Sequence, residues 1–265
     1  MTPIKTGIQS TALLALAFWP ALAGAQDMMA GVDLKSPQMT EAKLTRDEVK
    51  AMVDAGGPVD LSRKWLNGLD LSRLDLKGAD FSHARLNGTK LAESELNGAR
   101  FDLAWGVGAD FGDAEMEGAS LFQGQFPKAS FKAANLEKAR IVGNFDGADF
   151  SEANLETARM GVDMKNQSMG LLRASLRSAK LDGANVTGAD LSKADLSFAK
   201  LREAELPGAD LSGAKLAGAD LTGANVEGMK VEGADLDGTV LKNLDGGDRI
   251  VGLDEARNVK RAVRD

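Results

Sequence analysis

The chain has 265 residues, one histidine and no cysteine, and its 39 acidic and 32 basic side chains give a net charge of −7. Without cysteine it forms no disulfide, carries no lipid anchor on a cysteine and has no zinc site of the usual kind. The acidic balance also argues against direct binding of nucleic acid, which requires a basic surface.

The first 25 residues have the pattern of a secretory signal. Lys5 supplies a positive start, residues 11–23 form an apolar core, and Ala23-Gly24-Ala25 is a small-x-small cleavage site. The apolar run is too short to span a bilayer comfortably. We therefore expect cleavage after Ala25 and a periplasmic or secreted protein without a membrane anchor, the alternative being an uncleaved anchor.

Residues 26–58 combine a polar leader with one helix. Thr45 can cap that helix, because Glu48 three residues later completes a capping box. Gly56, Gly57 and Pro58 end it. Since a solenoid leaves an apolar end and unpaired edges, we expect this helix to cover the first coil.

A five-residue repeat organises residues 59–243. A small residue, a polar residue and then a large apolar residue recur, as in ANVTG ADLSK ADLSF AKLRE. A five-residue period does not build one stripe on a helix of 3.6 residues per turn, and a disordered tract would not keep it. The repeat therefore predicts a solenoid, with an irregular break at residues 161–170.

The repeat resembles the A-(D/N)-L-x-x motif of the pentapeptide-repeat family. The resemblance implies an all-β solenoid, a right-handed quadrilateral parallel β-helix, in which each pentapeptide forms one side. The apolar centres then fill about nine coils, capped by helices at both ends. In the family the centre and the small residue two before it point inward, and the predicted core includes Leu61, Leu71, Phe81, Leu191, Leu201, Leu211 and Leu221.

Residues 244–265 are expected to form a C-terminal capping helix. Asp254 and Glu255 would open it, basic residues crowd its end, and Leu253, Ala256 and Val259 share one face. The helix would cover the last coil, or its apolar face would form a homodimer interface.

Taking every twentieth residue lays out the sides of the rod. Asp75, Glu95 and Glu115 are expected to form an acidic stripe. A basic stripe on the adjoining side is expected to contain Arg100, Arg140, Arg159, Lys180 and Lys200. Such stripes are ordinarily solvated faces that keep a rod soluble.

We find no catalytic, metal or cofactor site in the sequence. His83 lies near Asp80 and Ser82, but the three are neighbours in sequence without an evident pocket or oxyanion hole. We therefore interpret His83 as an ordinary surface residue and expect no enzyme activity.

One row of side chains is unusual. Trp65, Arg85 and Trp105 are spaced by twenty and should lie on one face of three successive coils, as a platform for a glycan, a peptide or a partner loop. Two structural alternatives compete with this interpretation. Trp105 could turn inward to fill the space left by Gly106, or the segment before Thr45 could cover Trp65.

The function that these features favour is a non-enzymatic extracytoplasmic scaffold for an unidentified protein or envelope partner. The best-known activity of the pentapeptide-repeat family, mimicry of duplex DNA toward DNA gyrase, is the second choice. Export would separate the protein from gyrase. The small excess of acidic over basic side chains, which are interspersed along the solenoid, is also a poor imitation of duplex DNA with its one negative charge per ~1.7 Å.

Overall fold

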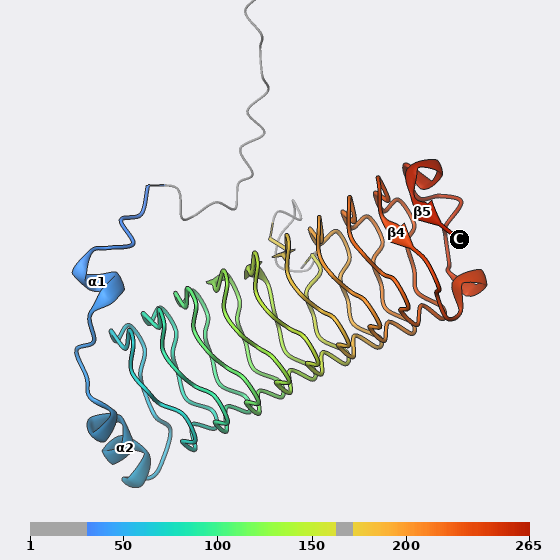
Figure 1. Cartoon of the computed structure of the whole chain (residues 1–265). Coiled ribbons are helices and arrows are strands. Elements are labelled where there is room, and N and C mark those ends of the chain that lie inside the picture. The colour runs from blue at the N-terminus through green and yellow to red at the C-terminus, as the bar shows by residue number, and fades with distance from the viewer. Residues whose placement is uncertain (1–30, 163–171) are drawn as a thin grey trace, which may run out of the picture.

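The computed structural model describes residues 31–162 and 172–265, which form one elongated solenoid. The coils follow one another along a rod, with the helices α1 (Pro37–Thr40) and α2 (Arg46–Asp54) at one end and the strands β4 (Val240–Leu241) and β5 (Val263–Arg264) at the other (Figure 1). The expected signal segment, residues 1–25, and most of the break at 161–170 lie outside the described residues.

Backbone hydrogen bonds between successive coils hold the rod together. The N–H of Leu61 donates to the carbonyl of Asp80 at 2.8 Å, and the N–H of Asp80 donates to the carbonyl of Val59 at 2.9 Å. The same parallel pattern recurs coil after coil, and it satisfies the backbone groups that face a neighbouring coil.

The paired residues form four rows along the rod, one for each side, and each is named here by its first member. The Asp60 row contains Asp60, Asp80, Arg100, Ser120, Arg140, Arg159, Asp190, Asp210, Lys230 and Val251. The Trp65 row contains Trp65, Arg85, Trp105, Gln125, Asn144, Ser175, Asp195, Lys215, Asp235 and Arg257. The Asp70 row contains Asp70, Lys90, Asp110, Ser130, Asp149, Lys180, Lys200, Asp220, Val240 and Val263. The Asp75 row contains Asp75, Glu95, Glu115, Asn135, Asn154, Asn185, Glu205, Asn225 and Asp245.

The interior is filled by the central apolar residues and by the small residues two positions before them. The predicted core is confirmed, since its seven members have no exposed surface: Leu61, Leu71, Phe81, Leu191, Leu201, Leu211 and Leu221. Aromatic centres stack between neighbouring coils, as Phe111 does on Phe131 with ring centroids 4.8 Å apart and planes within 3°. This distance matches the spacing of hydrogen-bonded strands, so the rings pack in step with the backbone.

The helix α2 covers the first coil, and its capping box has the predicted geometry. The N–H of Thr45 donates to Glu48 Oε2 at 2.7 Å, and the N–H of Glu48 donates to Thr45 Oγ1 at 3.3 Å. Val49 is fully buried against the core of the solenoid, whereas Met52 is exposed.

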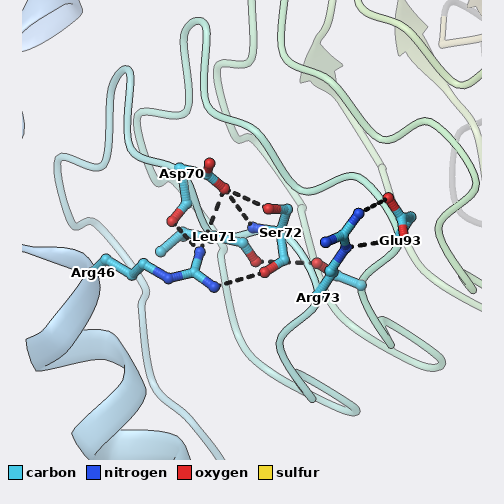
Figure 2. A network of polar contacts seen from close by, with 7 residues as sticks. Arg46, Asp70, Leu71, Ser72, Arg73 and Glu93 are labelled. Carbon is cyan, nitrogen blue, oxygen red and sulfur yellow. Dashed lines mark hydrogen bonds and ion pairs between the residues drawn. The ribbon is translucent and has the colours of Figure 1, made fainter.

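Arg46 covers the backbone edge of the first coil. Its guanidinium reaches from α2 to Asp70 and Ser72, where Nη1 donates to the Asp70 carbonyl and Nη2 donates to the Ser72 carbonyl at 2.9 Å (Figure 2). Arg73 and Glu93 form a two-point ion pair between neighbouring coils in the same region, with distances of 3.0 and 2.8 Å. The N-terminal edge is therefore bonded as well as covered.

The solenoid departs from its regular twenty-residue coil at two adjacent places. Strand β1 (Gly124–Gln125) pairs in parallel with β2 (Gly143–Asn144), so that coil has nineteen residues, one fewer than the regular coil. Strand β2 pairs in turn with β3 (Ala174–Ser175), thirty-one residues later. Because of this long step, Lys180 and Lys200 lie on the Asp70 row and not beside Arg140 and Arg159, so the predicted basic stripe is wrong beyond Arg159.

The prediction of a C-terminal capping helix was wrong, because residues 244–265 form no α-helix. They contain two short 3-10 helices, η1 (Gly247–Arg249) and η2 (Val259–Arg261), and they extend three rows by one further member before β5 pairs with β4. Gly252 and Asn258 have φ of +72° and +59°, and such left-handed residues interrupt a helix. The proposed dimer through a C-terminal helix therefore loses its structural basis. In the described ranges, no helix has the length and apolarity that crossing a membrane requires.

Candidate functional site

The predicted alignment of Trp65, Arg85 and Trp105 is confirmed. Trp65 pairs with Arg85, and Arg85 pairs with Trp105, so the three lie on successive coils of the Trp65 row. All three are half-buried. The repeat thus places two indoles and a guanidinium at strand spacing along one side of a rigid ladder.

Trp65 is covered by a segment of the same chain, as one of the two structural alternatives predicted. Lys43 lies over the indole, with Nζ 3.7 Å from the ring centroid. The N–H of Lys43 donates to the Trp65 carbonyl at 2.8 Å, and Ala42 pairs in antiparallel fashion with Leu66. One face of the first indole is therefore occupied within the molecule.

Two asparagines hold this covering segment in place. Asn67 Nδ2 donates to the carbonyls of Gln38 and Glu41 at 3.1 and 2.8 Å. Asn87 Nδ2 donates to the carbonyl of Met39 at 3.0 Å, and the Met39 side chain is buried. Sequence reasoning missed these anchors, although the repeated Leu-Asn-Gly at 66–68 and 86–88 marks both positions.

In the part of the chain that the structure describes, Arg85 is the cation that lies over the Trp105 ring. The Arg85 Cζ lies 5.5 Å from the centroid of the Trp105 ring, within the range of a cation–π contact. The Nε of Arg85 is buried without a hydrogen-bond partner in the described structure. The Nη1 of Arg85 donates one long hydrogen bond of 3.4 Å to the His83 carbonyl. Partial burial lowers the pKa of Arg85, because it disfavours the charged form, but the guanidinium stays charged.

The other structural alternative for Trp105, that it turns inward, is wrong. A side chain at Gly106 would meet Phe126, whose ring atoms lie 2.4 Å from the position of a Cβ. A Cβ at Gly124 would also lie 2.4 Å from this ring. The fully buried Phe126 therefore fills the space left by both glycines, and Trp105 stays on the outward row.

The neighbourhood of His83 does not form a catalytic arrangement. Asp80 Oδ1 accepts the N–H of Ser82 at 2.8 Å, so this carboxylate braces a turn. Ser82 Oγ is buried without a hydrogen-bond partner in the described part of the chain, and His83 is exposed at the turn. Among residues 31–162 and 172–265, no group of three or more histidine and acidic side chains is placed to hold a metal ion.

The predicted acidic stripe lies on the Asp75 row, but amides continue it. Asp75, Glu95 and Glu115 are succeeded by three asparagines, and these amides bond one another along the rod. Asn154 Nδ2 donates to Asn135 Oδ1 at 3.2 Å, and Asn185 Nδ2 donates to Asn154 Oδ1 at 3.2 Å. Three of the nine members of this row therefore form a neutral hydrogen-bonded amide ladder, which interrupts the line of charge.

The chain belongs to the pentapeptide repeat family. The family description "Pentapeptide repeats" matches it in overlapping segments that cover residues 59–121 and 171–243, more than half of its length. No curated protein matches the chain.

Several solved structures resemble the chain. HetL, a pentapeptide repeat protein involved in heterocyst differentiation regulation in the cyanobacterium Nostoc sp. strain PCC 7120, is 25% identical over 83% of this chain and 94% of its own, with a TM-score of 0.38. QnrB1, a plasmid-mediated fluoroquinolone resistance protein, is 20% identical over 78% of this chain and 90% of its own, with a TM-score of 0.32. A pentapeptide repeat protein of the Arabidopsis thaliana thylakoid lumen is 25% identical over 62% of this chain and 78% of its own, with a TM-score of 0.19. These proteins are right-handed quadrilateral β-helices, and at such TM-scores the likeness says nothing about function.

Proposed function

We propose that this protein is a non-enzymatic interaction scaffold outside the cytoplasm, and that it binds a protein or envelope partner through the Trp65 row. The observation that carries the proposal is Trp105, a half-exposed indole held against Arg85 on a hydrogen-bonded ladder. A rigid aromatic side chain beside an arginine is the combination most often responsible for binding energy at interfaces.

The binding contact is assigned to Trp105 and Arg85, because Lys43 already occupies Trp65. Within the described residues the Nη groups of Arg85 form no ion pair with a carboxylate, and a partner carbonyl or carboxylate beside the indole would accept hydrogen bonds from them. An extended peptide or a glycan lying along the row would meet both groups, since a ladder presents a line of contacts and not a pocket.

Truncation of Trp105 tests this assignment. Trp105→Ala should cost no more than about 1 kcal/mol in the free energy of unfolding, because the side chain is outward, and should abolish partner capture. The matched variant Trp65→Ala should lower stability by more, because it removes the surface on which Lys43 rests. A loss of roughly 3–5 kcal/mol for Trp105→Ala in chemical denaturation would instead show that this indole is structural.

The location outside the cytoplasm rests on the signal pattern of residues 1–25. N-terminal sequencing of the protein recovered after cell fractionation should give a chain that begins at Gln26, in the periplasm or the medium. A cytosolic protein that keeps Met1 would contradict export, and it would make action on DNA gyrase the better hypothesis.

A further inference from the structure

Phe198 is an exposed aromatic side chain in an unfavourable backbone conformation. Its relative exposure is 60%, against 44% for Val251, the next most exposed large apolar side chain of the described chain. Its φ is +62°, in the left-handed region that bulky residues avoid, and the equivalent turn positions of the neighbouring coils hold Ser178 and Gly218. Folding therefore gains little from a phenylalanine at this turn.

The ring of Phe198 is nevertheless fixed in place. A Cβ at Gly218, in the next coil, would lie 2.7 and 2.8 Å from Cδ1 and Cε1 of Phe198, so the ring rests on the glycine backbone. Because Gly218 carries no side chain, one face of the ring packs on the coil while much of the rest stays in solvent. A pre-positioned aromatic ring loses little conformational entropy when a partner covers it.

Basic residues lie on the coils next to this ring. Lys200 lies two residues further on, beside Lys180 on the Asp70 row, although like charges at paired positions repel. Lys180 is neutralised by Asp149 at 2.9 Å, whereas Lys200 has no ion-pair partner within the described residues. Arg177, in the preceding coil, lies 3.6 Å from Asp195.

Most of the other basic residues near Phe198 form ion pairs with carboxylates. Lys215 and Arg202 are also balanced, by Asp195 at 3.3 Å and Asp182 at 3.0 Å. Asp220, the row neighbour of Lys200, is turned to Thr222, whose N–H donates to Oδ1 at 3.0 Å. Lys200 is therefore the basic residue of this corner that forms no ion pair within the described residues, although the charges of Asp182 and Asp220 lie near it.

We propose that the corner of the solenoid around Phe198 is a docking surface for an acidic segment of a partner protein, separate from the contact assigned to Trp105 and Arg85. The ring takes an apolar side chain of that segment, and Lys200 takes a carboxylate beside it. A rim of opposite charge steers such a segment to the ring and sets its orientation.

The geometry favours a protein segment over an anionic membrane or a second copy of the chain. The basic residues alternate with Asp149, Asp182 and Asp195, so they present no continuous basic face to a bilayer. The Asp75 row of a second copy is acidic but has no exposed large apolar residue to meet the ring.

Fluorescence anisotropy with labelled short peptides tests the proposal. The probe contains glutamate and aspartate around one central leucine, and its matched control has serine in place of the leucine. Wild-type protein should bind the leucine probe more tightly, and Phe198→Gly should weaken binding by about ten-fold or more without lowering the unfolding midpoint. Lys200→Glu should weaken binding similarly, with a smaller effect at high salt.

Matched variants separate this surface from the others. Lys128→Gly changes the same kind of left-handed turn elsewhere, and Lys230→Glu reverses a charge on the Asp60 row, so both should bind as wild type does. Trp105→Ala should also leave probe binding unchanged, which distinguishes this surface from the contact at Trp105 and Arg85. The proposal would be overturned if the probe did not bind, or if wild type and Phe198→Gly bound it equally. It would also be overturned if the protein bound phosphatidylserine vesicles in place of the probe, or if it self-associated and Phe198→Gly abolished that self-association.

Discussion

At the scale of single residues, inward and outward positions alternate over very short stretches of chain. Leu201 is fully buried at the centre of a repeat, and Lys200 directly before it is exposed. Such neighbours share a backbone environment but differ in what surrounds their side chains, so they make a matched pair for measuring the value of burial.

Leu201→Ala should lower the free energy of unfolding by roughly 2–5 kcal/mol, because it opens a cavity between stacked coils. Lys200→Ala should change it by no more than about 0.5 kcal/mol, since its side chain is exposed and unpaired in the described structure. Urea denaturation of both variants measures the difference, and similar losses would contradict the inward register.

Asp195 is a buried carboxylate that the fold holds in its charged form. Burial alone would raise its pKa, but hydrogen bonds from Ser197 and the charge of Lys215 outweigh that effect and lower it. Because the folded pKa lies below the unfolded one, the charged form stabilises the protein above the unfolded pKa of about 3.9. This stabilisation is lost as the pH falls through the lowered pKa.

Unfolding measured between neutral pH and about pH 3 should therefore show a shallower acid loss for Asp195→Asn than for wild type. The variant should also be less stable near neutral pH by about 1–3 kcal/mol, because it removes the carboxylate that faces Lys215 and Arg177. Identical acid profiles for wild type and Asp195→Asn would show that this carboxylate is not held in its charged form.

At the scale of elements, the sequence predicted local features well and failed where distant contacts decide. The capping box of α2 depends on Thr45 and Glu48 alone, so it could be read directly. The C-terminal segment has helical spacing at Leu253, Ala256 and Val259, but its backbone instead supplies hydrogen-bond partners for the last coil. Sequence periodicity cannot distinguish these outcomes when tertiary pairing outweighs helix propensity.

The candidate site was predictable in position but not in its surroundings. The twenty-residue spacing was enough to place Trp65, Arg85 and Trp105 on one row. That Lys43 covers Trp65 could be foreseen only as one alternative, because it depends on bonds from Asn67 and Asn87 to a segment far away in sequence. Phe198 carried no signal, since it replaces a turn residue and leaves the repeat intact.

The two glycines around Phe126 form a size-matched cavity that can be tested. Gly106→Ala should destabilise the protein by roughly 1–3 kcal/mol, because the new methyl group would overlap the ring. In a Phe126→Leu background the same change should cost clearly less, since the smaller side chain leaves room. Thermodynamic double-mutant cycles measure this coupling, and strictly additive losses would contradict the packing described.

At the scale of the whole molecule, the two ends of the rod differ. The N-terminal end is covered by α2 and bonded by Arg46. At the C-terminal end the apolar residues of the last coil, such as Leu253 and Val259, are only partly buried. Because each coil of a solenoid contacts mainly its neighbours, local stability should follow this asymmetry.

Hydrogen exchange followed by mass spectrometry should therefore show amides in residues 244–265 exchanging at least about ten-fold faster than those in residues 176–241. The first coil should be better protected than the last, because a helix and an arginine cover its edge. Uniform protection along the rod would indicate that the whole solenoid opens as one unit.

The nineteen-residue coil and the long step after it together add ten residues to two turns of the rod, which equals two sides of the square. Every surface row beyond that point is thus moved to the opposite side relative to a strict count of twenty, while each apolar centre still points inward. Insertions or deletions in multiples of five would rotate one part of the rod against the other by quarter turns without repacking the interior. Evolution could in this way bring separate patches, such as those around Trp105 and Phe198, onto the same or different sides of one inherited core.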